Sequence, residues 1–168
     1  MYKSLFNKNE EITSFDELEK FENLTSLGQS ARTGYSESLF YNCINLQSIK
    51  LPSSIRFIGN DCFAKCSSLT AIQGNLSNVE IVGEGSFAYS GITNIDLSES
   101  KITSVLYGVF AGCPNLTSVK LPPGEVSTIR KQAFYHCDNL ESITGLSGTV
   151  TVYSGAFNRC SKLPQSFF

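Results

Sequence analysis

Six cysteines give this 168-residue chain most of its potential chemistry, and five of them recur at a regular spacing. Those five are Cys43, Cys66, Cys113, Cys137 and Cys160. Zinc ligands usually come in pairs two to four residues apart, whereas successive members of this set are 23 or more residues apart. The spacing therefore argues against a metal site. The sixth cysteine, Cys62, is predicted to be a small core residue.

The other reactive side chains form no catalytic group in the sequence. His136 is the only histidine, and no acid or nucleophile is tied to it by spacing, so we expect a solvated turn residue rather than a general base. The segment Gly83–Gly85 resembles part of a phosphate loop but lacks a third glycine. The fifteen acidic residues show no recurrent pair of the kind that glycosidases use. We predict no enzymatic activity, no cofactor and no metal.

Charge and hydropathy exclude two further classes of partner. The net charge is -2, with acids and bases mixed along the chain, and no basic run offers the phosphate contacts of a nucleic-acid binder. No apolar run approaches the roughly 18 residues of a membrane helix. We therefore expect neither nucleic-acid binding nor membrane insertion.

Phenylalanine sets the period that must position these cysteines. A phenylalanine recurs every 23 or 24 residues, usually with a cysteine three residues later and a leucine six residues later. The positions are Phe40, Phe63, Phe87, Phe110, Phe134 and Phe157. A period this short is typical of a solenoid, in which each coil is completed by its neighbours. Equivalent cysteines would then stack about 4.8 Å apart with parallel side chains, which predicts a row of reduced, inert, buried thiols.

Short strands are expected on both sides of each coil. Around Ile49 and Leu51 apolar and polar residues alternate, which predicts a strand with these two side chains inward. Pro52 follows and ends it, because proline cannot donate to a ladder. The β-branched segments Val79–Val82 and Thr149–Tyr153 favour a second strand on the opposite side. The spine of the core is predicted to contain Phe63, Phe87, Phe110 and Phe134.

The N-terminal residues depart from the repeat. Ser14 followed by Glu17 is a capping-box pattern, which predicts a short helix over Ser14–Phe21. The segment from Phe21 to Leu27 then mimics the repeat without its cysteine. We assign residues 1–34 to an N-terminal cap with an atypical first repeat and residues 35–168 to the repeats of one continuous domain.

The C-terminal residues are apolar and have no following coil. Leu163, Phe167 and Phe168 would lie at the open end of the last coil. The end of a solenoid exposes strand edges and an apolar surface, which invites association unless it is capped. This end is therefore a candidate assembly surface, either folded back on itself or covered by a partner.

The outward strand positions form two small, polar columns without an aromatic residue. The candidate contact surface that they define is Ser48, Lys50, Gln73, Asn94, Asp96, Ser118, Lys120, Ser142 and Thr144. Protein hot spots favour Trp, Tyr and Arg, so a solvated face that binds nothing tightly stays an open alternative. The tyrosines lie in the turns beside the phenylalanines, and that turn edge competes with the strand columns as a contact surface.

One segment carries a family resemblance. IKLPSSIRFIGNDCFAKCSSLTAI (Ile49–Ile72) resembles, almost position by position, the unit IxLPxxVxxIGxxAFxxCxxLxxI of BspA-type leucine-rich repeats. The resemblance covers roughly residues 12–163. It implies a right-handed, β-rich leucine-rich-repeat solenoid of about six coils, which we expect to be capped by the N-terminal helix. It also implies surface-exposed or secreted proteins of gut and oral bacteria and some protists that act in adhesion.

The resulting functional prediction is a non-enzymatic protein-binding, adhesion or display module at an extracellular surface. Its partner is expected to be a host, matrix or assembly protein. The alternative is a structural or decoration subunit of a larger assembly such as a virus particle. The opening MYKSLFNKNEE lacks the apolar segment of a secretory signal, so an extracellular location supposes a trimmed leader, and the alternative places the chain on a virion surface.

Overall fold

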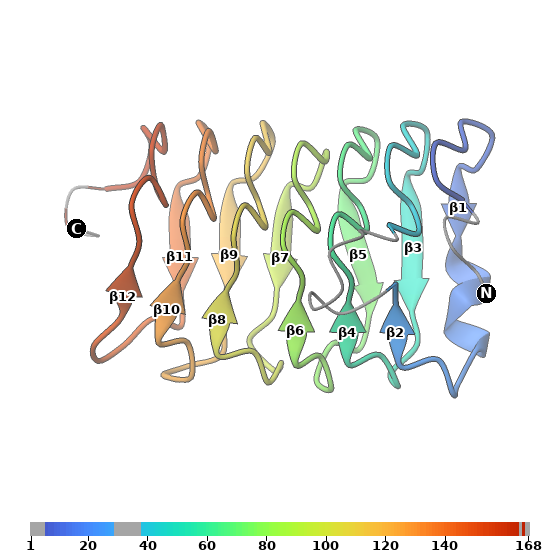
Figure 1. The fold of residues 1–168 in the computed structure, drawn as a ribbon, viewed down its shortest axis with the longest axis horizontal. Helices are drawn as coiled ribbons and strands as arrows, with labels where there is room; N and C mark the ends of the chain where they lie inside the picture. The colour runs from blue at the N-terminus through green and yellow to red at the C-terminus, as the bar shows by residue number, and fades with distance from the viewer. Residues whose placement is uncertain (1–5, 29–37, 165, 167–168) are drawn as a thin grey trace.

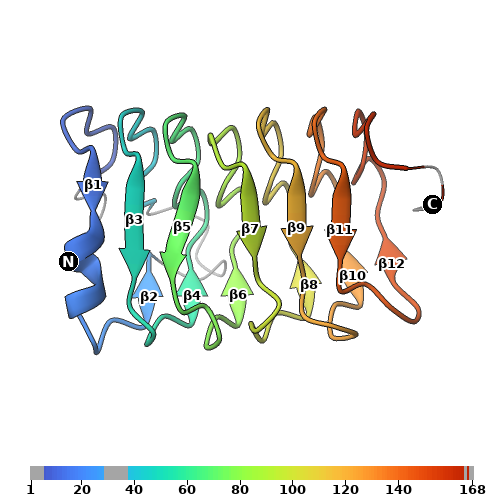
Figure 2. The same cartoon turned by 180° about the vertical axis from the view of Figure 1, so that it is seen from behind.

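The chain forms a solenoid with strands on two opposite sides, as the computed structural model shows for residues 6–28, 38–164 and 166 (Figures 1 and 2). One side carries β1 (Ser14–Phe15), β3 (Ser48–Leu51), β5 (Ala71–Gly74), β7 (Asn94–Asp96), β9 (Ser118–Lys120) and β11 (Ser142–Thr144). The other carries β2 (Ser26–Leu27), β4 (Phe57–Ile58), β6 (Ile81–Val82), β8 (Ser104–Val105), β10 (Thr128–Ile129) and β12 (Thr151–Val152). The predicted β-rich solenoid is confirmed.

Within each sheet, every strand pairs in parallel with the equivalent strand of a neighbouring coil. Ile49 is opposite Ile72 and Ile95 is opposite Val119, so the inward positions of successive coils coincide. Each side is divided into two three-stranded sheets, β1-β3-β5 and β7-β9-β11 on one and β2-β4-β6 and β8-β10-β12 on the other. The division falls where the segment from Phe87 to Ile92 is one residue shorter than its equivalents, and a Cβ on Gly91 would lie 2.1 Å from the carbonyl oxygen of Ser67 there. Only glycine lets the two coils approach so closely there.

Stacked phenylalanines form the predicted spine of the core. The turns at the top of Figure 1 carry them, and successive ring centroids lie 5.2 to 5.8 Å apart with interplanar angles of 1 to 16°. We call this set the phenylalanine stack: Phe6, Phe40, Phe63, Phe87, Phe110, Phe134 and Phe157. The five members from Phe40 to Phe134 are at most 1% exposed, so the stack is a continuous apolar column.

The helix predicted over Ser14–Phe21 is present only as a shorter 3-10 helix, and the predicted capping box at Ser14 is wrong. Ser14 belongs to β1 and pairs with Ser48, and the residues that follow form a five-residue 3-10 helix, η1 (Asp16–Lys20), without a side-chain cap. Backbone pairing with β3 and the packing of Phe15 against the core stabilise this segment. An isolated capped helical turn would have neither contact and is marginally stable in water. The first coil therefore ends in a strand and a short 3-10 turn.

The register of the first coil also differs from the prediction. Phe21, which was expected to take the repeat phenylalanine position, is 55% exposed, and Phe6 takes that position by stacking on Phe40. A signal for this was present, because Phe6, Ile12 and Phe15 have the same spacing as the corresponding residues of the next coil. Phe6 precedes Phe40 by 34 residues instead of 23 or 24, which hid the match.

At the other end Leu163 is 7% exposed, and Phe167 and Phe168 lie outside the described residues. In the part of the chain that the structure describes, no helix has the length and apolar character needed to cross a bilayer.

Candidate functional site

The cysteines are buried and unpaired, and each thiol of the repeating row has a defined polar partner. The Sγ atoms of Cys66, Cys113 and Cys137 each lie 3.0 Å from the carbonyl oxygen of a phenylalanine in the preceding coil. Cys43 and Cys160 make the same contact at 2.8 and 3.1 Å. The predicted ladder of buried free thiols is confirmed, and its members also donate hydrogen bonds that tie one coil to the next.

Five of the six thiols are poor nucleophiles in this environment, whereas a hydrogen bond with Cys66 lowers the pKa of Cys43. Burial raises the pKa of Cys113 and of Cys160 to about 11, and it raises the pKa of Cys62 and Cys137 further. Since the thiolate is the reactive species, these residues are almost entirely protonated at neutral pH. Within the described ranges, no group of three or more His, Cys, Asp or Glu side chains is arranged to hold a metal ion.

The nine predicted contact residues all lie on the outward side of β3, β5, β7, β9 and β11. We call this surface the strand face: Ser48, Lys50, Gln73, Asn94, Asp96, Ser118, Lys120, Ser142 and Thr144. Parallel pairing places them in two columns, with Lys50 opposite Gln73 and Asp96 opposite Lys120. The structure therefore brings these residues together as the sequence predicted.

The charges of the strand face are paired within the chain. Lys50 Nζ lies 2.6 Å from Glu19 Oε2, and Lys120 Nζ lies 2.9 Å from Asp96 Oδ2. Hydrogen bonds from Ser98 and Lys120 lower the pKa of Asp96 to about 2. Such exposed pairs contribute little to stability, but they leave the face without an isolated charge for a partner to neutralise.

A different surface runs along the turns that carry the phenylalanine stack. Tyrosines one or two residues after a stack phenylalanine, or three residues before it, lie along these turns. We call this surface the tyrosine edge: Tyr41, Tyr89, Tyr107 and Tyr135. Tyr89 and Tyr107 are 56% and 46% exposed, so much of each ring is accessible to a partner. Aromatic rings in such positions are characteristic of interaction sites.

The backbone of these turns is the same in every coil. The residue two positions after each stack phenylalanine up to Phe157 is left-handed, with φ between 58 and 68°. Several of these residues line the hollows described below. The amide groups of two of them, Lys65 and Tyr89, donate to the carbonyl oxygens of Ala88 and Ala111 in the next coil, at 2.8 Å in both cases. The turns are thereby fixed, and their side chains are displayed from a rigid backbone.

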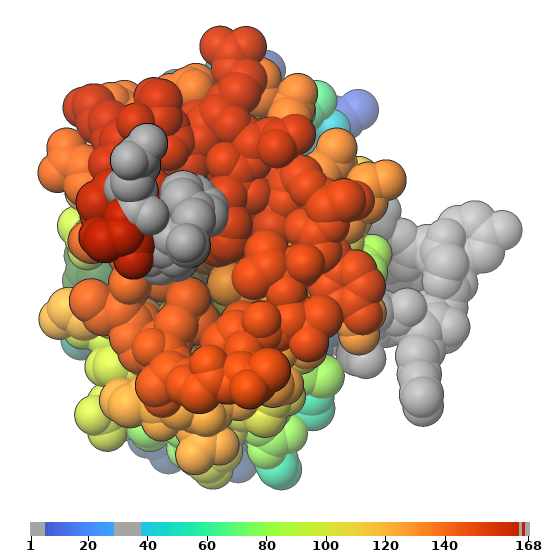
Figure 3. All heavy atoms as spheres, turned by 90° about the vertical axis from the view of Figure 1, so that its left-hand side faces the viewer, coloured from blue at the N-terminus to red at the C-terminus, as the bar shows by residue number. Residues whose placement is uncertain are grey.

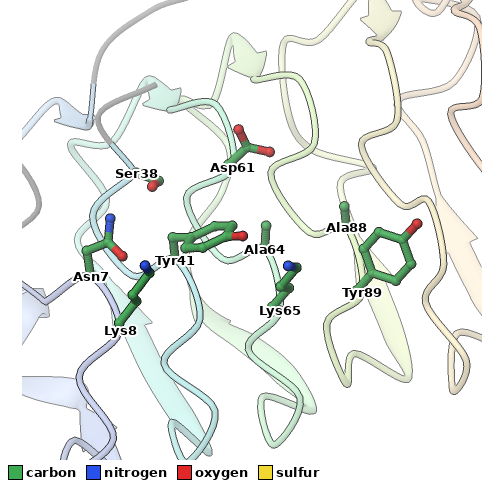
Figure 4. Close-up of a pocket in the computed structure, with 9 residues that line it drawn as sticks. All are labelled: Asn7, Lys8, Ser38, Tyr41, Asp61, Ala64, Lys65, Ala88 and Tyr89. Carbon is green, nitrogen blue, oxygen red and sulfur yellow. The ribbon is translucent and has the colours of Figure 1, made fainter. Parts of the chain in front are cut away.

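Three hollows follow one another along the tyrosine edge, and Tyr89 lines all of them. The first has a volume of about 500 Å³ and lies between Tyr41 and Tyr89, with Lys65 beside it (Figure 4). The second, of about 350 Å³, lies between Tyr89 and Tyr135 and includes Tyr107. The third, of about 380 Å³, adds His136, Pro114 and Asp138.

The tyrosine rings are held in place by local contacts. The ring of Tyr89 lies against Gly112, where a Cβ would come within 2.4 Å of it. Lys65 Nζ is 5.4 Å from the centroid of the Tyr41 ring, a cation–π distance. The hydroxyl of Tyr107 lies 2.7 Å from Gln132 Oε1 and donates to it. These rings are therefore preorganised, which lowers the entropy that a partner must overcome.

His136 also lies on this edge, as a half-buried turn residue. Its Nδ1 is 3.5 Å from Asp138 Oδ2, and Arg159 Nε is 3.7 Å from the other carboxylate oxygen. No serine, cysteine or threonine nucleophile completes the cluster in the described residues that line this hollow. The arrangement is that of a small polar network around the Asp138 carboxylate.

The C-terminal end of the solenoid is formed by the last coil, onto which Figure 3 looks. A hollow of about 520 Å³ opens there, with mostly apolar walls that include Ile143, Leu146 and Val152. Val152 is 52% exposed. Leu163, the described member of the predicted assembly end, is buried and contributes little accessible surface.

Comparison with known proteins gives a consistent result for the fold. The family model for the BspA type leucine-rich repeat region matches residues 33–164 in six copies. The chain is similar to the T. pallidum leucine rich repeat protein TpLRR, with 26% sequence identity, a TM-score of 0.60, and coverage of 76% of this chain and 70% of that one. It is also similar to a leucine rich cell surface protein of Faecalibacterium prausnitzii, with 28% identity, a TM-score of 0.48, and coverage of 76% of this chain and 27% of that one. A search of curated proteins found no match.

Proposed function

The chain belongs to the BspA-type leucine-rich repeat family, and on this premise we propose that it is a non-enzymatic protein-binding module displayed at an extracellular surface, where it serves adhesion. Leucine-rich repeats provide long, rigid surfaces for protein contact. The described residues offer two such surfaces, the strand face and the tyrosine edge.

The exposed tyrosines are the single observation that carries the proposal. Tyr89 and Tyr107 are 56% and 46% exposed at the centre of a continuous row of hollows. Hot spots in protein interfaces are enriched in tyrosine and are surrounded by contacts of small energy. The strand face stays a rival contact surface, but its charges are paired within the chain. We therefore favour the tyrosine edge.

A binding comparison tests this proposal. The immobilised chain is exposed to a panel of purified extracellular matrix proteins, and dissociation constants are measured by biolayer interferometry. Changing Tyr89 and Tyr107 to serine should weaken binding at least tenfold, whereas changing Lys50 and Lys120 to alanine should alter it less than threefold. No binding to any panel member would overturn the adhesion role, and the opposite pattern between the variants would assign contact to the strand face.

The extracellular location has its own test. An antibody raised against the chain should label intact, unpermeabilised source cells. Labelling only after permeabilisation would contradict the proposed location.

A further inference from the structure

The geometry of the tyrosine edge points to one class of partner segment. We propose that the groove between Tyr41 and Tyr135 binds a proline-rich segment in the polyproline II conformation. This inference rests on the proposed protein-binding function and names the chemistry of the partner. We call the surface the edge groove and define it by its floor: Tyr41, Ala64, Ala88, Ala111 and Tyr135.

The floor of the edge groove is made of the residue that follows each stack phenylalanine. Five successive coils place Tyr41, three alanines and Tyr135 at this position. The first two hollows share Asp61, Ala88 and Tyr89, so they are parts of one depression. Figure 4 shows Tyr41 and Tyr89 at either side of the small side chains of Ala64 and Ala88. Small residues between aromatic ones leave room for a narrow, extended ligand.

Main-chain groups that line the groove already form hydrogen bonds with the neighbouring coils. The amide groups of Lys65 and Tyr89 donate to the next coil, and the carbonyl oxygen of Ala64 accepts from Asn42 at 2.8 Å. A partner strand therefore cannot be added by β-augmentation, which needs free main-chain groups. Recognition must come from side chains. A polyproline II segment suits this because it has no internal hydrogen bonds and docks into aromatic-lined grooves.

The spacing of the tyrosines fits the repeat of such a segment. Tyr41, Tyr89 and Tyr135 follow Phe40, Phe87 and Phe134, which are separated by two coils in each case. Successive rings of the phenylalanine stack on these turns lie 5.3 to 5.8 Å apart, so two coils advance about 11 Å. A polyproline II helix rises about 3.1 Å per residue with three residues per turn, or about 9.3 Å per turn. The difference per turn is smaller than the rise of one residue, so a ligand centred on Tyr89 can place one turn toward each of the two outer rings.

The polar groups along the groove are compatible with an uncharged ligand. Lys8 and Lys65 lie on the side opposite Asp61, so the first hollow carries charges of both signs rather than a field of one sign (Figure 4). Burial raises the pKa of Asp61, and the negative charge of the nearby Glu84 raises it further. The hydroxyl of Tyr89 makes no hydrogen bond to any described residue, so it is available to the carbonyl groups that a polyproline II backbone displays.

A synthetic peptide tests the inference. Binding of fluorescein-labelled dodecaproline to the 168-residue chain is measured by fluorescence anisotropy, with a Gly-Ser dodecamer as the unstructured control. We expect saturable binding of dodecaproline, no saturable binding of the control peptide, and at least a tenfold loss of affinity for Tyr89→Ala. Tyr153→Ala is the matched variant, because Tyr153 is 44% exposed and lines none of the three hollows; it should bind like the wild type.

Three outcomes would overturn the inference. They are no saturable binding of dodecaproline, equal binding by the Tyr89→Ala chain, and displacement of a matrix protein from the edge by an unbranched oligosaccharide but not by dodecaproline, which would assign the groove to sugars. If a matrix protein still loses binding on substitution of Tyr89 and Tyr107, only the peptide class is wrong and the protein-binding function survives.

Discussion

The strand face and the tyrosine edge are built by the same repeat, yet they differ in which side chains stay available for contact with a partner. On the strand face Lys50 pairs with Glu19 and Lys120 pairs with Asp96. On the tyrosine edge Tyr89 and Tyr107 keep about half of their surface exposed while their rings stay fixed. A repeat decides where a column of side chains points, whereas the residue types in each column decide whether that column can bind. Four predictions can break or sharpen this comparison.

The largest effect is expected from the core that supports both surfaces. The ring of Phe87 lies between those of Phe63 and Phe110, with centroids 5.5 and 5.8 Å away. Phe87→Ala should lower the free energy of unfolding by about 3–5 kcal/mol, since it leaves a cavity in a closed stack. Urea denaturation measures this. Phe21→Ala, at a residue 55% exposed, is the control and should cost less than about 0.5 kcal/mol. Similar losses for the two variants would refute the phenylalanine stack as the main source of stability.

A smaller effect is expected at the glycine that supports Tyr89. Gly112→Ala introduces a Cβ at 2.4 Å from the Tyr89 ring and strains a backbone with φ of 68°. Gly148→Ala has a similar φ of 69° and meets nothing within 4 Å, so it isolates the backbone strain of about 1–2 kcal/mol.

We expect Gly112→Ala to be the more destabilising of these two variants in thermal unfolding. It should also weaken dodecaproline binding, which Gly148→Ala should leave unchanged. Equal behaviour of the two variants would show that the Tyr89 ring moves freely and is not preorganised.

The thiol row should affect stability only at high pH. The pKa of Cys113 and Cys160 rises from the ordinary value of 9.0 to about 11 on burial, so the folded state holds these protons more tightly than the unfolded state. The resulting stabilisation is fully present below pH 9 and is lost as the pH rises through 11. Unfolding by urea at a series of pH values should show this decline.

Thiol labelling at pH 8 gives an independent check on the same residues. The folded chain should react slowly, and all six thiols should react after denaturation without a reductant. Rapid labelling of several thiols in the folded chain would contradict their burial, and missing thiols after denaturation would reveal disulfides.

The smallest effect is expected on the strand face. Lys120→Ala removes one partner of an ion pair whose side chains are 60% and 52% exposed, so it should cost less than about 0.5 kcal/mol. The pKa of Asp96 is lowered to about 2 by Ser98 and Lys120. Its small contribution is therefore present above the ordinary pKa of 3.8 and is lost as the pH falls through 2. A loss of more than about 1 kcal/mol in chemical denaturation at pH 7 would contradict the view of this pair as a solvated surface contact.

The fold could be predicted from the sequence because its strongest signal is periodic. The spacing from Phe40 to Phe157 specified the stack, and the strands around Ile49 and Ile95 followed from alternation. The first coil was not predicted correctly, because local capping at Ser14 competed with strand pairing to a residue 34 positions later, Ser48. Local patterns do not report such long-range pairing.

The two surfaces differed in how much the sequence could say about them. The strand columns were predictable because the side-chain period of a strand is two. For the turns, the sequence indicated a competing surface that carries tyrosines but not the edge groove, since these tyrosines occupy different positions relative to the phenylalanine. Tyr41 follows Phe40 directly, whereas Tyr89 is two residues after Phe87. Only the left-handed turns and the stacking of coils bring them to one groove. The division into residues 1–34 and 35–168 stays a prediction.

The most direct measurement of the central claim, that the tyrosine edge is the contact surface, is hydroxyl-radical footprinting of the chain with and without a bound matrix partner. We predict that oxidation of Tyr89 and Tyr107 falls at least fivefold on binding, while oxidation of Tyr153 and of the peptides that carry Lys50 and Lys120 stays unchanged. Protection of the Lys50 and Lys120 peptides with both edge tyrosines still fully oxidised would contradict the account.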